Sequence, residues 1–345
     1  MAVIPGDGIG TEVVPAAQAV LEKAGSRFGF ELAWQELDWS CERYAQQGAM
    51  MPPDGLDQLR ETDAVFLGAV GRPGVPDHVS LWGLLIPIRR AFRQHVNHRP
   101  IRLFEGVPGP LRDRGKPIDF VVVRENNEGE YSEIGGRLYR GSEDEMAVQE
   151  SVFTRRGVQA VMRYAFDLAG SRAGRLLSAT KSNGIVHTMP FWDEIFAEMS
   201  DLYPQVKTSQ YHIDALAALF VTQPEDLDVV VSSNLFGDIL SDLGAAVAGS
   251  IGIAPSANLN PSREFPSMFE PVHGSAPDIA GRGIANPIGQ VWSGALMLEH
   301  LGQPEAAQAI LDALTRLLAE GGPRTPDLGG TADTGEVTDA LLGAL

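Results

Sequence analysis

Short apolar runs alternate with longer segments of helical periodicity along the chain. Runs rich in Val, Leu and Phe predict buried strands, whereas apolar residues repeating with the helical period predict helices that pack against them. The predicted strands span residues 64–68, 120–125 and 229–232, and the predicted helices span 11–24, 155–168, 191–200, 236–247, 289–300 and 305–318. This order predicts an α/β fold layered around a sheet.

The composition restricts the size of the core and the class of partner. With 345 residues, 44% of them hydrophobic, the chain can bury a sizeable core and divide into two lobes. The 45 acidic residues outnumber the 27 Lys and Arg, and the formal net charge of -18 repels nucleic acid phosphates and anionic membrane surfaces. No apolar run approaches membrane-spanning length. We therefore expect neither nucleic acid nor membrane as a partner.

The single cysteine indicates in which cellular compartment the protein is expected. Cys41 cannot form a disulfide within the chain, and no Cys/His cluster has the spacing of a zinc site. The first residues already predict a strand and a turn, which leaves no room for a signal peptide. A reducing cytoplasm is the expected location, and Cys41 is expected to be inert because nothing adjacent marks an activating base.

A glycine-rich turn lies at residues 4–10, Ile-Pro-Gly-Asp-Gly-Ile-Gly. Its spacing is G-x-G-x-G, which lacks the third glycine position of the Rossmann dinucleotide fingerprint. A tight strand-to-helix turn, with Thr11 and Glu12 opening the helix, explains the glycines at least as well. The motif alone therefore does not predict a nucleotide site.

A cluster of polar residues, 232–242, follows the apolar run at 229–231 and begins a helix. Asp238 and Asp242 are four residues apart, so both carboxylates point to one helix face. Two like charges are unfavourable there unless a cation neutralises them, and a hard divalent ion such as Mg²⁺ or Mn²⁺ takes oxygen ligands. A solvated helix face, with Asp238 favoured by the helix dipole, explains the pair equally well.

Several arginines supply the opposite charge. Arg89 and Arg90 lie in a mostly apolar stretch, Arg99 precedes Pro100, and Arg124 directly follows a buried-strand run. A buried arginine needs an anionic partner, and its guanidinium fork matches a carboxylate. Several converging arginines would suit a dicarboxylate substrate, although for any one of them a structural ion pair is the simpler interpretation.

Three further polar residues, Tyr131, Lys181 and Asp214, lie among small or polar neighbours. Taken singly, each could be an ordinary hydrogen-bonding side chain. Whether they have a functional role can be inferred only from the longer sequence segments in which they lie.

Six segments along the chain are 4–10 (IPGDGIG), 123–131 (VRENNEGEY), 179–183 (ATKSN), 234–242 (NLFGDILSD), 270–280 (EPVHGSAPDIA) and 284–287 (IANP). In their residues and their order, they resemble the β-decarboxylating dehydrogenases, the family of isocitrate, 3-isopropylmalate and tartrate/D-malate dehydrogenases. The resemblance covers essentially the whole chain.

Further segments are similar to the tartrate/D-malate branch of that family: 80–83, 125–131, 146–156, 188–192, 253–258 and 265–271. The isopropylmalate branch usually has Glu-Leu-Thr-Gly-Gly where this chain has residues 125–129. The resemblance thus implies NAD-dependent oxidative decarboxylation of D-malate to pyruvate and CO₂, and oxidation of tartrates with or without decarboxylation.

The family's fold implies a two-lobed α/β architecture around a mixed central sheet, which is not a standard Rossmann fold. We expect a large domain from residues 1–94 plus 249–345 with the nucleotide site. We expect a small domain from residues 95–248 with substrate, metal and dimer contacts. The family also implies a homodimer whose subunits complete each other's active sites, and pairing of dimers into tetramers is left open.

The resemblance places nucleotide binding away from the N-terminal glycines. The family's adenosine site matches His273, Gly274, Ser275, Ala276, Asp278, Ile279 and Asn286. Asp278 could accept a hydrogen bond from a ribose hydroxyl but would repel a 2′-phosphate, so NAD is expected rather than NADP. The NADP-using relatives carry Lys and Tyr at the positions of Asp278 and Ile279.

The same resemblance implies the chemical roles of the polar residues. Arg89, Arg99 and Arg124 would hold the substrate carboxylates, while Asp214, Asp238 and Asp242 would ligate Mg²⁺ or Mn²⁺, one of them from the partner subunit. Lys181 would remove the hydroxyl proton, directly or through a relay with Asp214, as hydride leaves C2 for NAD. Tyr131 would protonate the enol that remains after CO₂ departs.

Pro87 departs from the family pattern. It lies two residues before Arg89, where relatives often carry Ser, Lys or another helix-compatible residue. A proline inside a helix removes a backbone hydrogen bond, so we expect the helix to start near Pro87 or to be kinked there. Trp82 and Leu85, which match positions that contact the group on C3 in relatives, would be displaced by such a change.

Two alternatives stay open. The chain could be a 3-isopropylmalate or related 2-hydroxy diacid dehydrogenase, because fold does not fix substrate. It could also be a catalytically silent NAD-binding regulatory subunit, although such a protein would be expected to lack catalytic groups that this chain has. The sequence leaves the preferred divalent ion and a requirement for K⁺ undecided.

Overall fold

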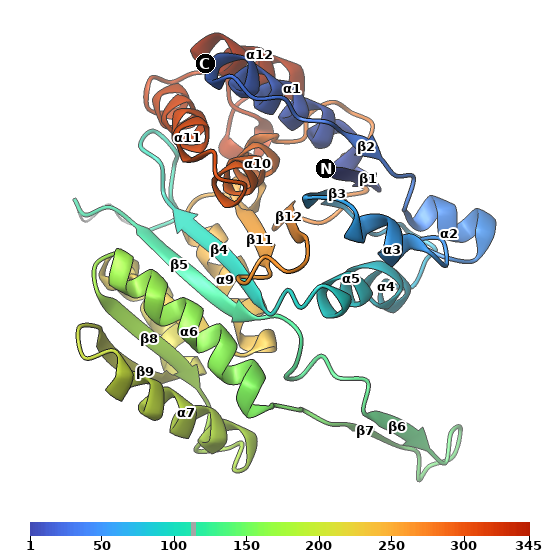
Figure 1. Cartoon of the computed structure of the whole chain (residues 1–345), viewed down its shortest axis with the longest axis vertical. Coiled ribbons are helices and arrows are strands. Elements are labelled where there is room, and N and C mark those ends of the chain that lie inside the picture. Colours follow the sequence, from blue (N-terminus) through green and yellow to red (C-terminus); the bar gives the residue numbers. More distant parts are fainter. Residues whose placement is uncertain (112–114) are drawn as a thin grey trace.

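The computed structural model describes residues 1–111 and 115–345, and in these residues ten strands form one sheet that runs through the molecule (Figure 1). The strand order is β2-β1-β3-β12-β11-β4-β5-β10-β8-β9. The bounds are β1 (Ala2–Gly6), β2 (Gln35–Glu36), β3 (Ala64–Ala69), β4 (Val96–Arg102), β5 (Asp119–Glu125), β8 (Arg175–Thr180), β9 (Lys207–His212), β10 (Val229–Ser232), β11 (Pro255–Leu259) and β12 (Ser267–Pro271). The three strands predicted from apolar runs are β3, β5 and β10.

The sheet is mixed, as the resemblance implied. Strands β2, β1, β3 and β12 are parallel to one another, and so are β5, β10, β8 and β9. Strands β11 and β4 join the two blocks through antiparallel pairs. Strands β3 and β10 are buried along their whole length, which explains why their sequences are continuous apolar runs rather than alternating patterns.

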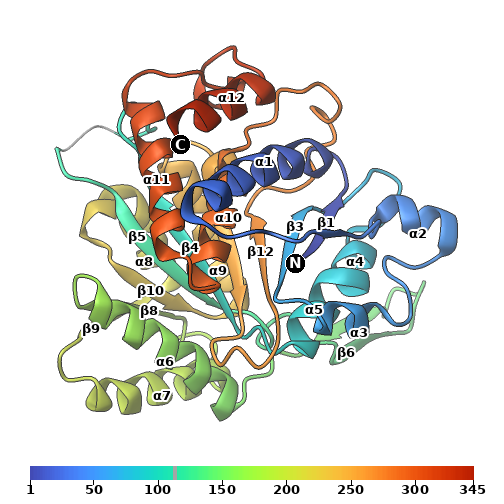
Figure 2. The same ribbon diagram turned by 45° about the horizontal axis from the view of Figure 1, so that its top comes forward.

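Helices cover both faces of the sheet. Their bounds are α1 (Gly10–Phe28), α2 (Cys41–Gln47), α3 (Gly55–Arg60), α4 (Asp77–Ser80), α5 (Ile86–Ala91), α6 (Arg155–Ser171), α7 (Thr188–Leu202), α8 (Ile213–Thr222), α9 (Asn234–Val247), α10 (Ile288–His300), α11 (Pro304–Ala319) and α12 (Thr334–Ala344). Helices α1, α10, α11 and α12 pack together over the first block (Figure 2), whereas α6 lies in front of the second block and α9 behind it (Figure 1). All six helices predicted from periodicity are present, with ends within a few residues of those expected.

The glycine-rich turn between β1 and α1 is closed by the loop that follows β12. The backbone N–H of Ile9 donates to the carbonyl of Ser275 at 2.9 Å. A Cβ at Gly8 would lie 2.0 Å from that carbonyl oxygen, and φ at Gly8 is +57°, so the position requires glycine. The loop after β12 therefore packs directly against the turn that precedes α1.

Pro87 follows a π-helical turn. The segment Leu81–Leu85 is π-helical and joins α4 to α5 without leaving helical dihedral angles. Helix α5 itself begins at Ile86, so regular α-helical hydrogen bonding starts again beside Pro87, directly after the π turn. Trp82 and Leu85 lie on the π turn and are half-buried.

A two-stranded arm, β6 (Gly135–Leu138) and β7 (Met146–Gln149), projects from the body (Figure 1). All of its strand residues are exposed, including the large apolar side chains of Leu138, Met146 and Val148. Because neither strand has a buried face, the arm has no apolar pattern by which it could have been predicted.

One sheet continues through both halves of the molecule. We propose that the halves correspond to a large domain, residues 1–94 plus 249–345, and a small domain, residues 95–248. Within the described parts of the chain, no helix is long and apolar enough to cross a membrane.

Candidate active site

Two of the predicted substrate-binding arginines come from neighbouring antiparallel strands. Arg99 lies on β4 and Arg124 on β5, and both side chains are almost fully buried. Helix α9 can approach them because Gly237 has no side chain. A Cβ at Gly237 would lie only 2.6 Å from the Cβ of Arg124. The glycine in the NLFGD segment therefore brings the α9 carboxylates against the arginines.

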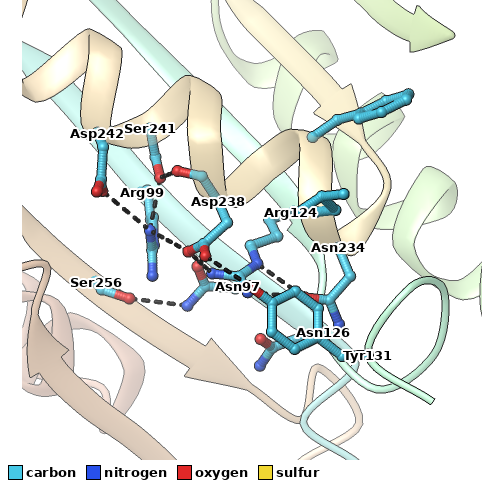
Figure 3. A network of polar contacts seen from close by, with 12 residues as sticks. Asn97, Arg99, Arg124, Asn126, Tyr131, Asn234, Asp238, Ser241, Asp242 and Ser256 are labelled. Carbon is cyan, nitrogen blue, oxygen red and sulfur yellow. Dashed lines mark hydrogen bonds and ion pairs between the residues drawn. The ribbon is translucent and has the colours of Figure 1, made fainter. Parts of the chain in front are cut away.

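Asp238 is the acceptor at the centre of this cluster (Figure 3). Its Oδ1 pairs with Arg124 Nη1 and lies 3.4 Å from Arg99 Nη1, while its Oδ2 accepts the Tyr131 hydroxyl at 2.9 Å. Burial by itself would raise the pKa of Asp238, but Arg124 and Arg99 outweigh it and lower the pKa below its ordinary value. Asp238 is therefore a stable anion that joins Tyr131 to both arginines.

Asp242 lies one turn further along α9 and is more exposed. Its nearest cation is Arg99, 3.9 Å away, at the limit of an ion pair. Burial, and the neighbouring charge of Asp238, raise the pKa of Asp242 despite Arg99. The two carboxylates share one helix face, as the sequence spacing predicted, and Asp242 keeps oxygen lone pairs for a further partner.

Arg89 completes a cluster of three arginines. Burial is the main cause that lowers the pKa of Arg99 and of Arg124, the latter to about 10, and charge repulsion from Arg89 contributes to both. The three guanidinium groups are thus close enough to repel one another. Such a cluster attracts a ligand with more than one carboxylate.

Each arginine also has a protein partner that the sequence alone did not single out. Asn234 Oδ1 accepts from Arg124 Nε at 3.1 Å and from Nη2 at 2.7 Å. Glu270 accepts from Arg89 Nη2 at 2.9 Å, and Ser241 accepts from Arg99 at 2.6 Å. All three partners lie inside or next to segments that carried the family resemblance, but their pairing depends on strand and helix packing.

Buried amides connect these partners across four strands. Asn258 on β11 donates to Glu270 at 2.7 Å and accepts from Asn97 on β4 at 3.0 Å and from Asn126 at 2.9 Å. Asn97 is the register partner of Arg124 on β5. The arginine cluster is therefore fixed by a hydrogen-bonded polar layer within the sheet.

The buried pair of Arg89 and Glu270 is expected to stabilise the fold, and a substitution at Glu270 tests this. Replacing Glu270 with alanine leaves the Arg89 charge and the Asn258 amide buried without this carboxylate. We expect the free energy of unfolding to fall by about 3 kcal/mol or more. Urea unfolding followed by circular dichroism at fixed protein concentration measures it.

Glu264→Ala provides the matched control. Glu264 pairs with Arg93 at 3.3 Å, but both side chains are more than half exposed. The loss should therefore stay below about 1 kcal/mol. Equal losses in the two variants would contradict a special contribution of the buried pair.

Lys181 and Asp214 form a separate pair. Lys181 follows the end of β8 and Asp214 opens α8 directly after β9, so both lie at the carboxyl edge of the parallel block. Lys181 Nζ donates to Asp214 Oδ1 at 2.7 Å, and this hydrogen bond is the main cause that lowers the pKa of Asp214. The Asp214 side chain is 70% exposed.

The three predicted metal ligands do not meet within one chain. Across residues 1–111 and 115–345, no group of three acidic, His or Cys side chains has the geometry of a metal site. Asp238 and Asp242 lie on α9, whereas Asp214 faces outward beside Lys181. The donor set is chemically suitable for a hard divalent ion, but its three members do not come together within the described residues.

The predicted nucleotide residues follow β12 in one loop. Burial lowers the pKa of His273, and its Nδ1 lies 3.0 Å from the carbonyl of Gly274. That carbonyl can only accept, so Nδ1 carries the proton and Nε2 is left as an acceptor. In the described part of the chain, no group hydrogen-bonds to the buried Nε2. An unused buried acceptor fits the exocyclic amine of adenine.

The other loop residues are held by local contacts. Ile279 N–H donates to the carbonyl of Ala276, whose φ is +40°, and Asp278 is exposed. Asn286 is buried and donates to Asp327 at 3.0 Å. The loop thus combines a buried end at His273 with an exposed carboxylate at Asp278.

Comparison with known proteins identifies the family of the chain. The sequence model of the family described as isocitrate/isopropylmalate dehydrogenase matches residues 1–341. The D-malate dehydrogenase (decarboxylating) of Escherichia coli is 57% identical, with 99% of this chain and 97% of that protein covered. The tartrate dehydrogenase/decarboxylase of Pseudomonas putida is 56% identical, with 100% and 97% covered.

A solved structure gives the same result. The isocitrate dehydrogenase of Methylococcus capsulatus superposes with a TM-score of 0.90 at 34% identity, covering 99% of this chain and 98% of that one. The α/β architecture expected from the sequence is confirmed by this likeness and by the mixed sheet. The chain therefore belongs to the isocitrate/isopropylmalate dehydrogenase family.

Proposed function

We propose that the protein is an NAD-dependent, metal-requiring, decarboxylating dehydrogenase of small 2-hydroxy diacids. D-malate would give pyruvate and CO₂, and tartrates would be oxidised with or without decarboxylation. The cluster of Arg89, Arg99 and Arg124 around Asp238 carries this proposal, because it suits a dicarboxylate next to an acidic metal site. The names of the two relatives above support the choice of substrate.

The arginines would orient the substrate. Guanidinium forks bind carboxylates in one plane, and Asn234 holds two nitrogens of Arg124 so that the third faces Asp238. The layer through Asn258 fixes Arg89 in the same way. A substrate held at both carboxylates has one hydroxyl-bearing carbon presented for reaction.

Asp238 and Asp242, with Asp214 of the partner subunit, would hold Mg²⁺ or Mn²⁺. The residues present fit this role, since all donors are carboxylate oxygens and Asp242 has a single distant ion-pair partner in the described chain. When bound, the divalent ion polarises the C2 oxygen and NAD accepts the hydride. The remaining steps belong to the side chains of the protein.

Lys181 and Asp214 would remove the hydroxyl proton. Lys181 Nζ, which hydrogen-bonds to Asp214 at 2.7 Å, would take the proton of the substrate hydroxyl directly or through a relay with Asp214. Tyr131 would then donate its phenolic proton to C3 of the enol formed when CO₂ leaves. Burial, followed by the charge of Asp238, raises the pKa of Tyr131 and keeps the phenol protonated until it is needed.

A homodimer would complete the site. The incomplete donor set of one chain and the exposed apolar residues of the arm both support a second copy as the partner. Lys181 and Asp214 of one subunit would then face the arginines and α9 carboxylates of the other.

The His273–Ile279 loop would hold the adenosine of NAD, and Asp278 would select against a 2′-phosphate. Replacing Asp278 with lysine turns repulsion into attraction, so the ratio of kcat/KM with NADP to that with NAD should rise about tenfold or more. Steady-state kinetics with both nucleotides measures it. Asp278→Asn removes only the repulsion and should give a smaller rise, and an unchanged ratio in both variants would remove Asp278 from the ribose site.

The function is tested by following NADH formation by the purified protein with Mn²⁺ and K⁺. D-malate, the tartrate stereoisomers, 3-isopropylmalate and isocitrate are presented separately. We expect D-malate or a tartrate to have the highest kcat/KM. Preference for 3-isopropylmalate would keep the family and overturn the substrate, and no turnover of any diacid would support a silent regulatory subunit instead.

A further inference from the structure

Arg90 stands next to Arg89 but has different partners. Its Nη2 donates to the carbonyl of Tyr131 at 3.0 Å, and its Nη1 pairs with Glu133 at 2.7 Å. Its guanidinium carbon lies 5.0 Å from the centre of the Trp82 ring. The side chain is two-thirds buried, with 33% exposed, so these contacts are partly shielded from water.

These contacts join two parts of the fold that are distant in sequence. Trp82 lies on the π turn before α5, whereas Tyr131 and Glu133 lie in the segment between β5 and the arm. A planar guanidinium can stack on a ring and donate from its edge at once, which a lysine cannot do. The position of the Trp82 ring is therefore linked to that of the Tyr131 backbone.

In the proposed function Tyr131 protonates C3 of the substrate. Trp82 would contact the group on the same carbon, which is the role that the family resemblance implies for its position. D-malate carries only hydrogens there, whereas tartrate carries a hydroxyl. A side chain that fixes both residues would connect recognition of the C3 group with protonation of C3.

We propose that Arg90 is a positioning residue that couples substrate discrimination by Trp82 to proton donation by Tyr131. This inference rests on the proposed function of the site. Arg90 touches neither the reacting atoms nor the substrate carboxylates, and it acts through its two neighbours.

Glu130 offers a contrast, because it is the sequence neighbour of Tyr131 and its side chain binds the start of α9. Its carboxylate accepts from Ser233 Oγ at 2.8 Å and from the backbone N–H of Leu235 at 3.0 Å, at the start of α9. Loss of Glu130 should loosen Tyr131 without reaching Trp82. Comparing variants of Arg90 and Glu130 therefore distinguishes an effect on the position of the proton donor from an effect on discrimination between substrates by their C3 group.

The experiment compares Arg90→Ala, Arg90→Lys and Glu130→Ala in the full-length protein with Mn²⁺ and NAD. Arg90→Ala should lower kcat on D-malate about tenfold or more, because a displaced proton donor reacts slowly. It should also narrow the wild-type preference between D-malate and tartrate, measured as the ratio of kcat/KM values, by about threefold or more. For Arg90→Lys, both kcat and the ratio of kcat/KM values should lie between those of the wild type and those of Arg90→Ala. Glu130→Ala should lower kcat on both substrates without changing the ratio of their kcat/KM values.

Arg27→Ala is the matched control. Arg27 is exposed and stacks on Phe28 at 5.4 Å, far from the site in the N-terminal helix, so both kinetic quantities should stay at the wild-type values. Melting temperatures of all variants show whether each one is folded.

Tryptophan fluorescence gives a second readout that does not depend on turnover. The Trp82 contribution is obtained by subtracting the spectrum of Trp82→Phe in each background, and it should change in Arg90→Ala but not in Glu130→Ala. An unchanged Trp82 contribution, or an unchanged substrate ratio in folded Arg90→Ala, would overturn the coupling. If the wild type turns over no hydroxy diacid, the proposed function fails, and the fluorescence alone decides whether Arg90 positions Trp82.

Discussion

Replacing Lys181 with alanine is expected to lower kcat on D-malate by roughly 10²- to 10⁴-fold, the range by which a positioned general base contributes. Lys181 Nζ lies 2.7 Å from Asp214 at the carboxyl edge of the parallel strands, where the substrate hydroxyl would meet it. KM should change little, because the arginines rather than Lys181 hold the carboxylates. NADH formation at saturating D-malate and Mn²⁺ measures the effect.

Lys207→Ala is the control for loss of a lysine in the same lobe, because Lys207 is exposed at the start of β9. It should keep wild-type kcat. If Lys181→Ala retains kcat within a few-fold of the wild type while remaining folded, the base is another group, and Asp214→Asn then tests whether Asp214 accepts the proton by itself.

The sequence predicts best those elements that have a clear buried face. Strands β3 and β10 are nearly continuous apolar runs, and β5 contains one at residues 120–123, because the sheet buries these residues on both sides. Strand β9 and the arm are exposed, so their pairing leaves no periodic apolar signal.

Strands β11 and β12 were missed for the opposite reason. They are fully buried, but they carry polar residues whose partners lie on other strands or in α5. Ser256 accepts from Asn97, Asn258 donates to Glu270, and Glu270 pairs with Arg89. A buried polar residue looks like a surface residue until its partner is known. Only the strand register, set by residues far apart in sequence, supplies that partner.

In the candidate site, too, some features follow from the sequence and others depend on how the elements pack. The spacing of Asp238 and Asp242 predicted a shared helix face because it depends only on helix geometry. Which arginine meets Asp238, and that Asn234 holds Arg124, depends on how closely α9 packs on β5 at Gly237. Only the resemblance predicts Lys181 and Asp214 as site residues. The structure adds that, within one chain, this pair lies apart from the carboxylates on α9.

Two inactive variants are expected to restore activity when they share a dimer. Lys181→Ala and Asp238→Asn should each be inactive alone, because each damages both sites of a homodimer. If Lys181 and Asp214 of one subunit complete the arginine and α9 cluster of the other, a mixed dimer carries one site with both changes and one intact site. Heterodimers isolated through two different affinity tags should therefore show about half of the wild-type kcat per dimer.

The matched control pairs Lys181→Ala with Asp214→Asn. These residues hydrogen-bond within one chain, so they would serve the same site, and each site of the mixed dimer would carry one of the two changes. That heterodimer should stay inactive although it assembles in the same way. Recovery in both mixtures would contradict the assignment of Lys181 and Asp214 to the same site, whereas recovery in neither would mean that Lys181 and Asp238 serve a site within a single subunit. Recovery in the first mixture alone assigns the incomplete donor set of the single chain to a site built by two subunits.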